Sequence, residues 1–361
     1  MTLAQIRRGM TVAAIAAATI LASCGPSAAE LEAQRLAAEA EARARIPPPV
    51  TLNEGVAQAA SVYVSFIRDV STISGGFQSP EAIQAAMRRG ADYDPATLSR
   101  GMIAYASIIA LQSPEFVAGV RSFSTDPVSR RQVVENLIAD PAYAATLPGA
   151  DYAAGLISTT LGQDITSLTA IADSVENDAY TIQERQDPRR RWAILPIANR
   201  EVRLEEAKTI SASGMLPSAE DSARLFAAAN SGTGLGLAAA RRGPPYTPAV
   251  INALAIAALA AMGAAGDEAR ANTEALTFES NSQFCLDMSK LNLFQCLAAS
   301  RPSYEDMFCV GRHIVRDLAS CAASSTIPAT IITNTAPTAI EGGTPIAINT
   351  GSLEQSPVSP N

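Results

Sequence analysis

The sequence predicts an all-α protein, a multi-helix bundle that ends in a disulfide-stapled helical hairpin and is flanked by a tether and a disordered tail. In NEGVAQAASVYVSFIRDV the apolar residues recur at steps of three and four, as on one face of a helix (Val56, Ala60, Tyr63, Ile67 and Val70). Ser, Thr or Asp directly followed by Pro recurs as an N-cap with a proline at the first helical position (Ser79, Asp94, Ser113, Asp126, Asp140 and Thr247). Alternating β-branched runs joined by Asn-Gly or Asp-Gly turns are missing, so strands are not favoured.

The composition fits helices that pack closely through small side chains. Hydrophobic residues make up 48% of the 361 positions, but alanine inflates this share and only 5% are aromatic. Such a length is enough for one large or two modest hydrophobic cores. The chain has 27 basic and 35 acidic residues, which argues against nucleic acid as a partner because phosphate binding requires a basic surface.

Residues 1–23 have the pattern of a secretory signal peptide. Arg7 and Arg8 precede an uncharged stretch from Met10 to Leu21. This stretch is too short to be a membrane span, and small residues follow it, as before a cleavage site.

The end of this signal, Leu21-Ala22-Ser23-Cys24, resembles the lipobox of bacterial lipoproteins. The resemblance implies that Cys24 is acylated and becomes the new N-terminus after cleavage. Gly25 in place of aspartate implies release to the outer membrane, where the protein would face the periplasm. Several acyl chains would give lasting attachment, since each buried methylene contributes about 0.8 kcal/mol.

Residues 24–50 are expected to form a tether. Ala, Glu and Arg dominate this segment, and these good helix formers end at three prolines, Pro47 to Pro49. A coiled coil is a poor alternative because no Leu, Ile or Val repeat is present.

Residues 51–230 are expected to form a helical domain, followed by a Gly/Pro linker at 231–247. Gly232, Gly234 and Gly236 in the linker invite comparison with a dinucleotide-binding loop. That loop requires a strand before it and a helix after it. A helical stretch precedes these glycines and Gly-Pro-Pro soon follows, so a linker is favoured and no cofactor is expected.

The last helical segment, residues 248–321, opens with the nearly uncharged PAVINALAIAALAAMGAAG. Asn252 interrupts this run, which is shorter than the roughly 20 residues that a bilayer core requires. We therefore expect a buried central helix here. Residues 322–361 have no helical period and only Glu341 and Glu354 are charged, so the tail is expected to be disordered.

Four cysteines in this segment are expected to form two disulfides, because an exported protein meets oxidising conditions. Their gaps lack the close pairs of a zinc site, so no metal is expected. They fall on two predicted helices, 284–299 and 303–320, which the short Ser-Arg-Pro joint makes antiparallel. Two cysteines on one helix lie about 16 Å apart, beyond the limit of roughly 7 Å for a bridge. The hairpin therefore predicts the nested pairs Cys285–Cys321 and Cys296–Cys309.

This arrangement resembles the twin-cysteine helical hairpins of small mitochondrial intermembrane-space proteins. The match is imperfect at the second helix. Eleven residues return to nearly the same helix face, whereas the twelve-residue step from Cys309 to Cys321 overshoots by about 120°. We therefore expect Cys321 at a frayed helix end. Ser303 is expected to begin this helix, with Asp306 three residues on.

The most distinctive polar segment contains Arg189, Arg190, Arg191 and the single tryptophan, Trp192. Arginines suit bidentate contacts with phosphate or carboxylate, and an exposed tryptophan suits an interface. This patch is the candidate interaction surface. The alternative is a solvated loop whose charge is balanced by neighbouring acidic residues (Glu184, Asp187, Glu201, Glu205 and Glu206).

Catalytic patterns are scarce, with neither G-x-S-x-G nor H-E-x-x-H in the sequence. The single histidine, His313, is expected to pack at the edge of the hairpin. Asp92, Asp94 and Asp151 could supply an acid–base pair for glycan cleavage, but nothing in the sequence selects them. No catalytic residue is assigned.

The expected function is that of an outer-membrane lipoprotein with a non-catalytic structural or interaction module in the periplasm. Its expected partners are the membrane, through acylated Cys24, and an envelope protein, peptidoglycan or lipopolysaccharide. The alternatives are an enzyme that acts on peptidoglycan and an accessory subunit of an envelope transport or assembly complex.

Overall fold

The computed structural model describes residues 27–185, 187–214, 216–231 and 234–328. These residues are all-α, as predicted, and the only β-type pairing among them is an isolated bridge between Pro196 and Pro302. All of them belong to one compact unit. The predicted signal at 1–23 and Cys24 lie outside the described residues.

The predicted tether contains helix α2 (Ala28–Ala44), which begins with a capping box. The Ser27 hydroxyl accepts a hydrogen bond from the Glu30 backbone, and the Glu30 carboxylate accepts one from the Ser27 backbone. None of the residues of α2 is buried. The segment after α2 meets the helical body, since Arg130 donates to the carbonyl of Ala44 and Arg121 donates to the carbonyl of Pro48.

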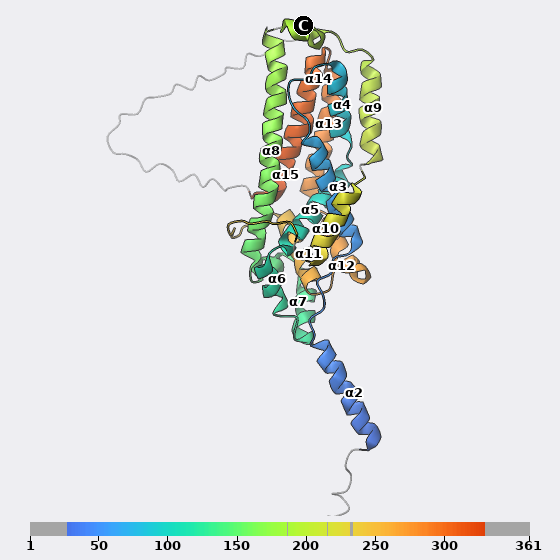
Figure 1. Ribbon diagram of the computed structural model, residues 1–361, viewed down its shortest axis with the longest axis vertical. Helices are drawn as coiled ribbons and strands as arrows, with labels where there is room; N and C mark the ends of the chain where they lie inside the picture. The colour runs from blue at the N-terminus through green and yellow to red at the C-terminus, as the bar shows by residue number, and fades with distance from the viewer. Residues whose placement is uncertain (1–26, 186, 215, 232–233, 329–361) are drawn as a thin grey trace, which may run out of the picture. The chain divides into compact units, whose positions relative to one another are not determined.

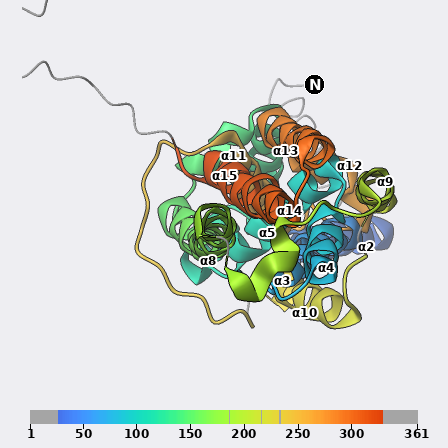
Figure 2. The same ribbon diagram turned by 90° about the horizontal axis from the view of Figure 1, so that it is seen from above.

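The core is built around two helices that are apolar on nearly all sides, α5 (Pro95–Leu111) and α11 (Pro248–Ala261). They pack with the amphipathic helix α3 (Glu54–Val70) and with the long helix α8 (Ala150–Arg185). Helix α11 is the buried central helix that the sequence predicts. Since α11 follows the predicted linker and the other three precede it, helices from both sides of the linker share this core (Figures 1 and 2).

The remaining helices surround this core and mostly begin where the sequence predicts. Each of the six predicted N-cap side chains accepts a backbone hydrogen bond at a helix start that has proline in its first turn. Besides α5 and α11, these starts open α4 (Pro80–Ala91), α6 (Pro114–Arg121), α7 (Pro127–Ala139) and the 3₁₀ helix η1 (Pro141–Thr146). The other elements are the 3₁₀ helices η2 (Pro188–Ile194), η3 (Asp267–Ala269) and η4 (Ala275–Thr277), and α9 (Arg200–Ser213), α10 (Ala219–Ser231) and α12 (Ala271–Glu274).

The described part of the predicted linker lies against the first turns of α8. The backbone amide of Arg242 donates to the carbonyl of Asp151 over 2.9 Å. A side chain at Gly155 would come within 2.0 Å of the Ala240 carbonyl oxygen, so glycine is required for this approach. Arg241 adds ion pairs with Asp151 and Glu115.

The C-terminal hairpin consists of α13 (Ser280–Ala299), followed by α14 (Ser303–Val310), a π-helical turn η5 (Gly311–Arg316) and α15 (Asp317–Thr326). The second arm packs along α8. The disulfides Cys285–Cys321 and Cys296–Cys309 join the arms with Cα separations of 5.6 and 5.7 Å, in the nested arrangement expected from the sequence.

The expectation that Cys321 lies at a frayed helix end is wrong. The π-helical turn lies between Cys309 and Cys321, and a π turn accommodates one more residue than an α turn. This extra residue absorbs the overshoot, so Cys321 faces α13 from inside α15 and is buried.

The predicted start of the tail at residue 322 is also too early, because α15 continues to Thr326. Ser325 is buried there and accepts two hydrogen bonds from other elements. Its hydroxyl accepts from the Ser282 hydroxyl, and its carbonyl accepts from the Thr247 hydroxyl. Residues 329–361 lie outside the described residues.

No single helix in the described ranges is both long and apolar enough to cross a membrane, whereas α5 and α6, which meet at an 82° bend, reach that length and composition only as a pair.

Candidate functional site

The turn of the disulfide hairpin is clamped by the segment between η2 and α9. The backbone amide of Ile197 donates to the carbonyl of Arg301 over 2.8 Å, and the amide of Ser303 donates to the carbonyl of Leu195 over 3.3 Å. These two bonds flank the bridge between Pro196 and Pro302. The stretch that directly follows the predicted arginine patch is therefore fixed to the tip of the hairpin.

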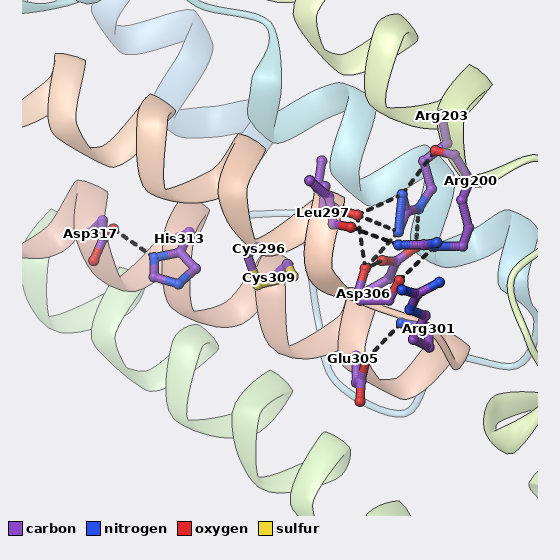
Figure 3. The surroundings of a disulfide bond; sticks show 12 residues. Arg200, Arg203, Cys296, Leu297, Arg301, Glu305, Asp306, Cys309, His313 and Asp317 are labelled. Atoms are coloured by element: carbon purple, nitrogen blue, oxygen red, sulfur yellow. Dashed lines mark hydrogen bonds and ion pairs between the residues drawn. A yellow bond between two sulfur atoms is a disulfide. The ribbon is translucent and has the colours of Figure 1, made fainter. Parts of the chain in front are cut away.

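Two arginines of α9 bind the C-terminal end of α13 (Figure 3). Arg203 donates to the carbonyl of Leu297 from both terminal nitrogens, over 3.1 and 2.9 Å. Arg200 donates to the carbonyls of Ala298 and Ser300, over 2.6 and 2.8 Å. The last carbonyls of a helix lack partners within the helix and carry partial negative charge, so a guanidinium group is well suited to them.

Arg203 also forms a buried ion pair with Asp306 of α14. Its Nε lies 2.6 Å from the Asp306 Oδ2, and the two side chains are only 4% and 1% exposed. The Ser300 hydroxyl accepts from Arg203 and donates to the Asp306 Oδ1, each over 2.6 Å. Burial raises the pKa of the Asp306 carboxyl, and the hydrogen bonds from Ser300 and Arg203 oppose this rise. We call Arg203, Leu297, Ser300 and Asp306 the hairpin latch.

The second hairpin helix begins at Ser303, as expected from the sequence. Its N-cap residue is Pro302, which has no side-chain capping bond. The Asp306 carboxylate, three residues after Ser303, accepts hydrogen bonds from Arg203 and Ser300. The Cys296–Cys309 disulfide lies next to the latch, since Leu297 follows Cys296 and Asp306 precedes Cys309 by three positions (Figure 3).

The latch forms one wall of an open cleft of about 370 Å³ between α4, η2, α9 and α14. Trp192 lines this cleft together with Leu195, Ile83 and the latch pair Arg203 and Asp306. A groove of about 550 Å³ between α4 and α9 continues from the cleft. Cleft and groove share three lining residues: Arg88, Val202 and Glu206.

The four residues of the predicted interaction patch do not form one basic surface. Arg189 and Arg191 are exposed. Arg190 is largely buried and forms ion pairs with Asp178 of α8 and with Asp187. Trp192 is partly buried against the core and faces the cleft rather than solvent alone.

The other polar residues that the sequence brought up have local structural roles. His313 packs at the hairpin edge, where its Nδ1 lies 3.2 Å from the Asp317 carboxylate and its ring meets Phe308 edge-on. Asp94 caps α5, and Asp151 pairs with Arg241.

Lys290 is a buried group that sequence analysis missed. Its Nζ donates to the carbonyl of Ala91, the last residue of α4, over 2.6 Å and lies 3.9 Å from the ring centre of Tyr93. Burial lowers the pKa of Lys290 to about 7, although Asp92 and Asp94 oppose the shift. Burial in turn raises the pKa of the Asp92 carboxyl. Lys290 lines neither the cleft nor the groove.

Within the described ranges, no cluster of three or more His, Cys, Asp or Glu side chains could hold a metal ion. Sequence analysis also missed the latch. The only local signal was the three-residue spacing of Arg200 and Arg203, which places both on one helix face. Comparisons with protein families, with curated proteins and with solved structures find no match for this chain.

Proposed function

We propose that the protein is an outer-membrane lipoprotein that faces the periplasm and whose helical body is a non-catalytic interaction module for an envelope partner. The lipobox-like Leu21-Ala22-Ser23-Cys24 supports the lipid anchor. Two disulfides suit an oxidising compartment, and the exposed helix α2 suits a tether between anchor and body.

The observation that carries the interaction role is the cleft and groove beside the hairpin latch. Leu195 and Val202 line it and are 58% and 57% exposed, so both offer apolar contact area to a partner. The buried charged groups of the cleft, Arg203 and Asp306, are paired with each other and hydrogen-bonded further. Such a surface offers apolar contact area to a partner, while its buried carboxylate and guanidinium are already paired with each other.

The contacts along α8 place this surface away from the tether. The tether meets α6 through Arg121, and α6 lies against the residues before α8, where Gly119 packs on Pro148. The hairpin latch lies near the other end of α8, where Tyr180 packs on Phe308. A helix as long as α8 spans about 54 Å. A partner at the cleft would therefore bind far from the end of the body that joins the tether.

A photo-crosslinking amino acid at Val202 in intact cells tests this proposal. The expected result is a specific adduct with an envelope component. The matched control position is Glu135, an exposed residue of α7 near the tether, where no such adduct should form. Equal adducts at both positions, or none at Val202, would contradict the proposal.

The non-catalytic part of the proposal has its own test. The chain from Gly25 onward is incubated with purified peptidoglycan, and soluble products are separated by chromatography. We expect no release above a buffer control. Released muropeptides would replace the interaction module with a peptidoglycan-acting enzyme.

A further inference from the structure

We infer that the groove between α4 and α9, together with the cleft that continues it, binds a basic amphipathic helix of a partner protein. This inference rests on the proposed interaction function and names the chemistry of the partner. Three features of the groove carry it: the apolar side chains on its α9 wall, its acidic rim and its length.

The wall facing the groove is the side of α9 that is left free by the core. Helix α9 buries only Arg203 and Ala207, four residues apart. Its groove side carries the apolar residues Val202 and Ile210, with the polar residues Glu206 and Thr209 between them. Helices dock into grooves of this kind through apolar residues at steps of three, four and seven.

The rim of the groove is acidic. Glu81 of α4 and Glu201, Glu205 and Glu206 of α9 line the groove or cleft, and all four are exposed. Arg88 is the exposed cation in the lining, and it lies 3.4 Å from Glu206 in an ion pair across the groove. The lining therefore keeps an excess of negative charge, which complements Lys and Arg on either side of an apolar stripe.

The charge distribution disfavours two other occupants. Phosphates of lipopolysaccharide and carboxylates of peptidoglycan would be repelled by the acidic rim, and the exposed Arg189 and Arg191 are not among the residues that line it. A second copy of this chain would bring another acidic rim against the first. The acidic rim would attract a basic helix and would not repel it.

The length of the groove fits several helical turns. The α9 residues that line the groove run from Glu201 to Ile210, about 15 Å of helix, which matches nearly three turns of a docked helix. Apolar side chains follow this length, from Leu195 in the cleft through Val202 to Ile210 at the far end.

The single tryptophan provides the readout, since Trp192 lines the cleft. The probe is an 18-residue peptide of Leu and Lys, without Trp, whose leucines follow the spacing of one helix face. The control peptide has Glu in place of Lys. Each is titrated into the chain from Gly25 onward, and Trp192 fluorescence is followed at low and high NaCl.

We expect saturable binding of the Leu/Lys peptide with a change in Trp192 emission, weaker binding at high salt, and no binding of the Leu/Glu peptide. Glu201→Lys/Glu205→Lys should weaken binding at least tenfold, and Val202→Asp should do the same. The charge-matched control, Glu39→Lys/Glu135→Lys, changes exposed sites outside the groove and should alter affinity less than twofold. Circular dichroism checks that each variant keeps its helicity.

Absence of binding by the Leu/Lys peptide overturns the inference. An equal loss of affinity in the two double variants also overturns it, because binding would then follow net charge alone. If Val202 forms a specific adduct in cells while the peptide does not bind, the partner chemistry is wrong and the interaction function stands. If Val202 forms no adduct, the interaction function itself fails.

Discussion

Replacing Arg203 with methionine should destabilise the protein more than any change to its exposed ion pairs. Arg203 is 4% exposed and supplies the cation next to Asp306, which is 1% exposed. Methionine has a similar stem, so the loss is mainly that of the charge and its hydrogen bonds. Removing one partner of a buried pair leaves the other charge without compensation, at a cost of about 3–5 kcal/mol.

This cost should be visible in urea unfolding followed by circular dichroism. With a slope of about 3 kcal/mol per molar urea, the midpoint should fall by roughly 1 to 1.7 M. Arg88→Met is the matched control because Arg88 and Glu206 are 47% and 48% exposed, and its effect should stay within about 1 kcal/mol. The double variant Arg203→Met/Asp306→Leu should recover most of the lost stability, since it leaves no buried charge.

The loss should also depend on pH in a defined direction. Burial already raises the pKa of Asp306, and removal of Arg203 raises it further. A carboxyl whose pKa is raised in the folded state contributes stability fully below its unfolded pKa. This contribution to stability is lost as pH rises through the folded pKa. The deficit of Arg203→Met should therefore be smaller at pH 4 than at pH 7. A deficit no larger than that of Arg88→Met at pH 7 would refute the buried-latch reasoning.

Three other changes test separate parts of the account. Deleting Arg312, an exposed residue of the π-helical turn, should leave both disulfides intact in non-reducing peptide maps. Deleting the exposed Ser320, which lies after this turn, should instead abolish the Cys285–Cys321 disulfide or greatly lower the melting temperature. Burial raises the pKa of Asp164 to about 6, so the charged carboxylate is unfavourable in the folded state. Asp164→Asn should therefore melt at a higher temperature than the native protein at pH 8 and lose this advantage by pH 4. A lower melting temperature of the variant at pH 8 would show that the charged form is favoured. Cys24→Ala should leave the protein unprocessed or misplaced in cell fractionation, and mature protein still found in the outer membrane would rule out the lipid anchor.

The sequence was sufficient for features that are encoded locally. The six proline-linked caps lie within a few residues of the backbone groups that they bind, and the spacing of four cysteines on two short helices left one compatible pairing. The π-helical turn was not predicted, although the twelve-residue step from Cys309 to Cys321, which does not fit an α-helix, indicated an irregularity. A gap that does not fit an α-helix can be resolved by fraying or by a π turn, and only packing decides between them.

The candidate site depends on contacts between distant residues. Arg203 and Asp306 are 103 positions apart, and neither lies in a pattern that selects the other. Arg190 was grouped with its basic neighbours, but its main partner is Asp178, twelve positions earlier in α8. Local charge alone therefore does not reveal that the fold pairs one of these arginines with acidic residues.

The central claim, that the groove and cleft form the binding surface, has a competitor within the same protein. Helix α13 exposes an apolar stripe of Phe284, Met288 and Leu291, at steps of four and three on the side opposite its buried face. In-cell photo-crosslinking at Val202 and at Phe284, compared under the same conditions, tests the two surfaces directly. We predict a specific adduct at Val202 and none at Phe284. An adduct at Phe284 with none at Val202 would contradict the account and move the binding surface to α13.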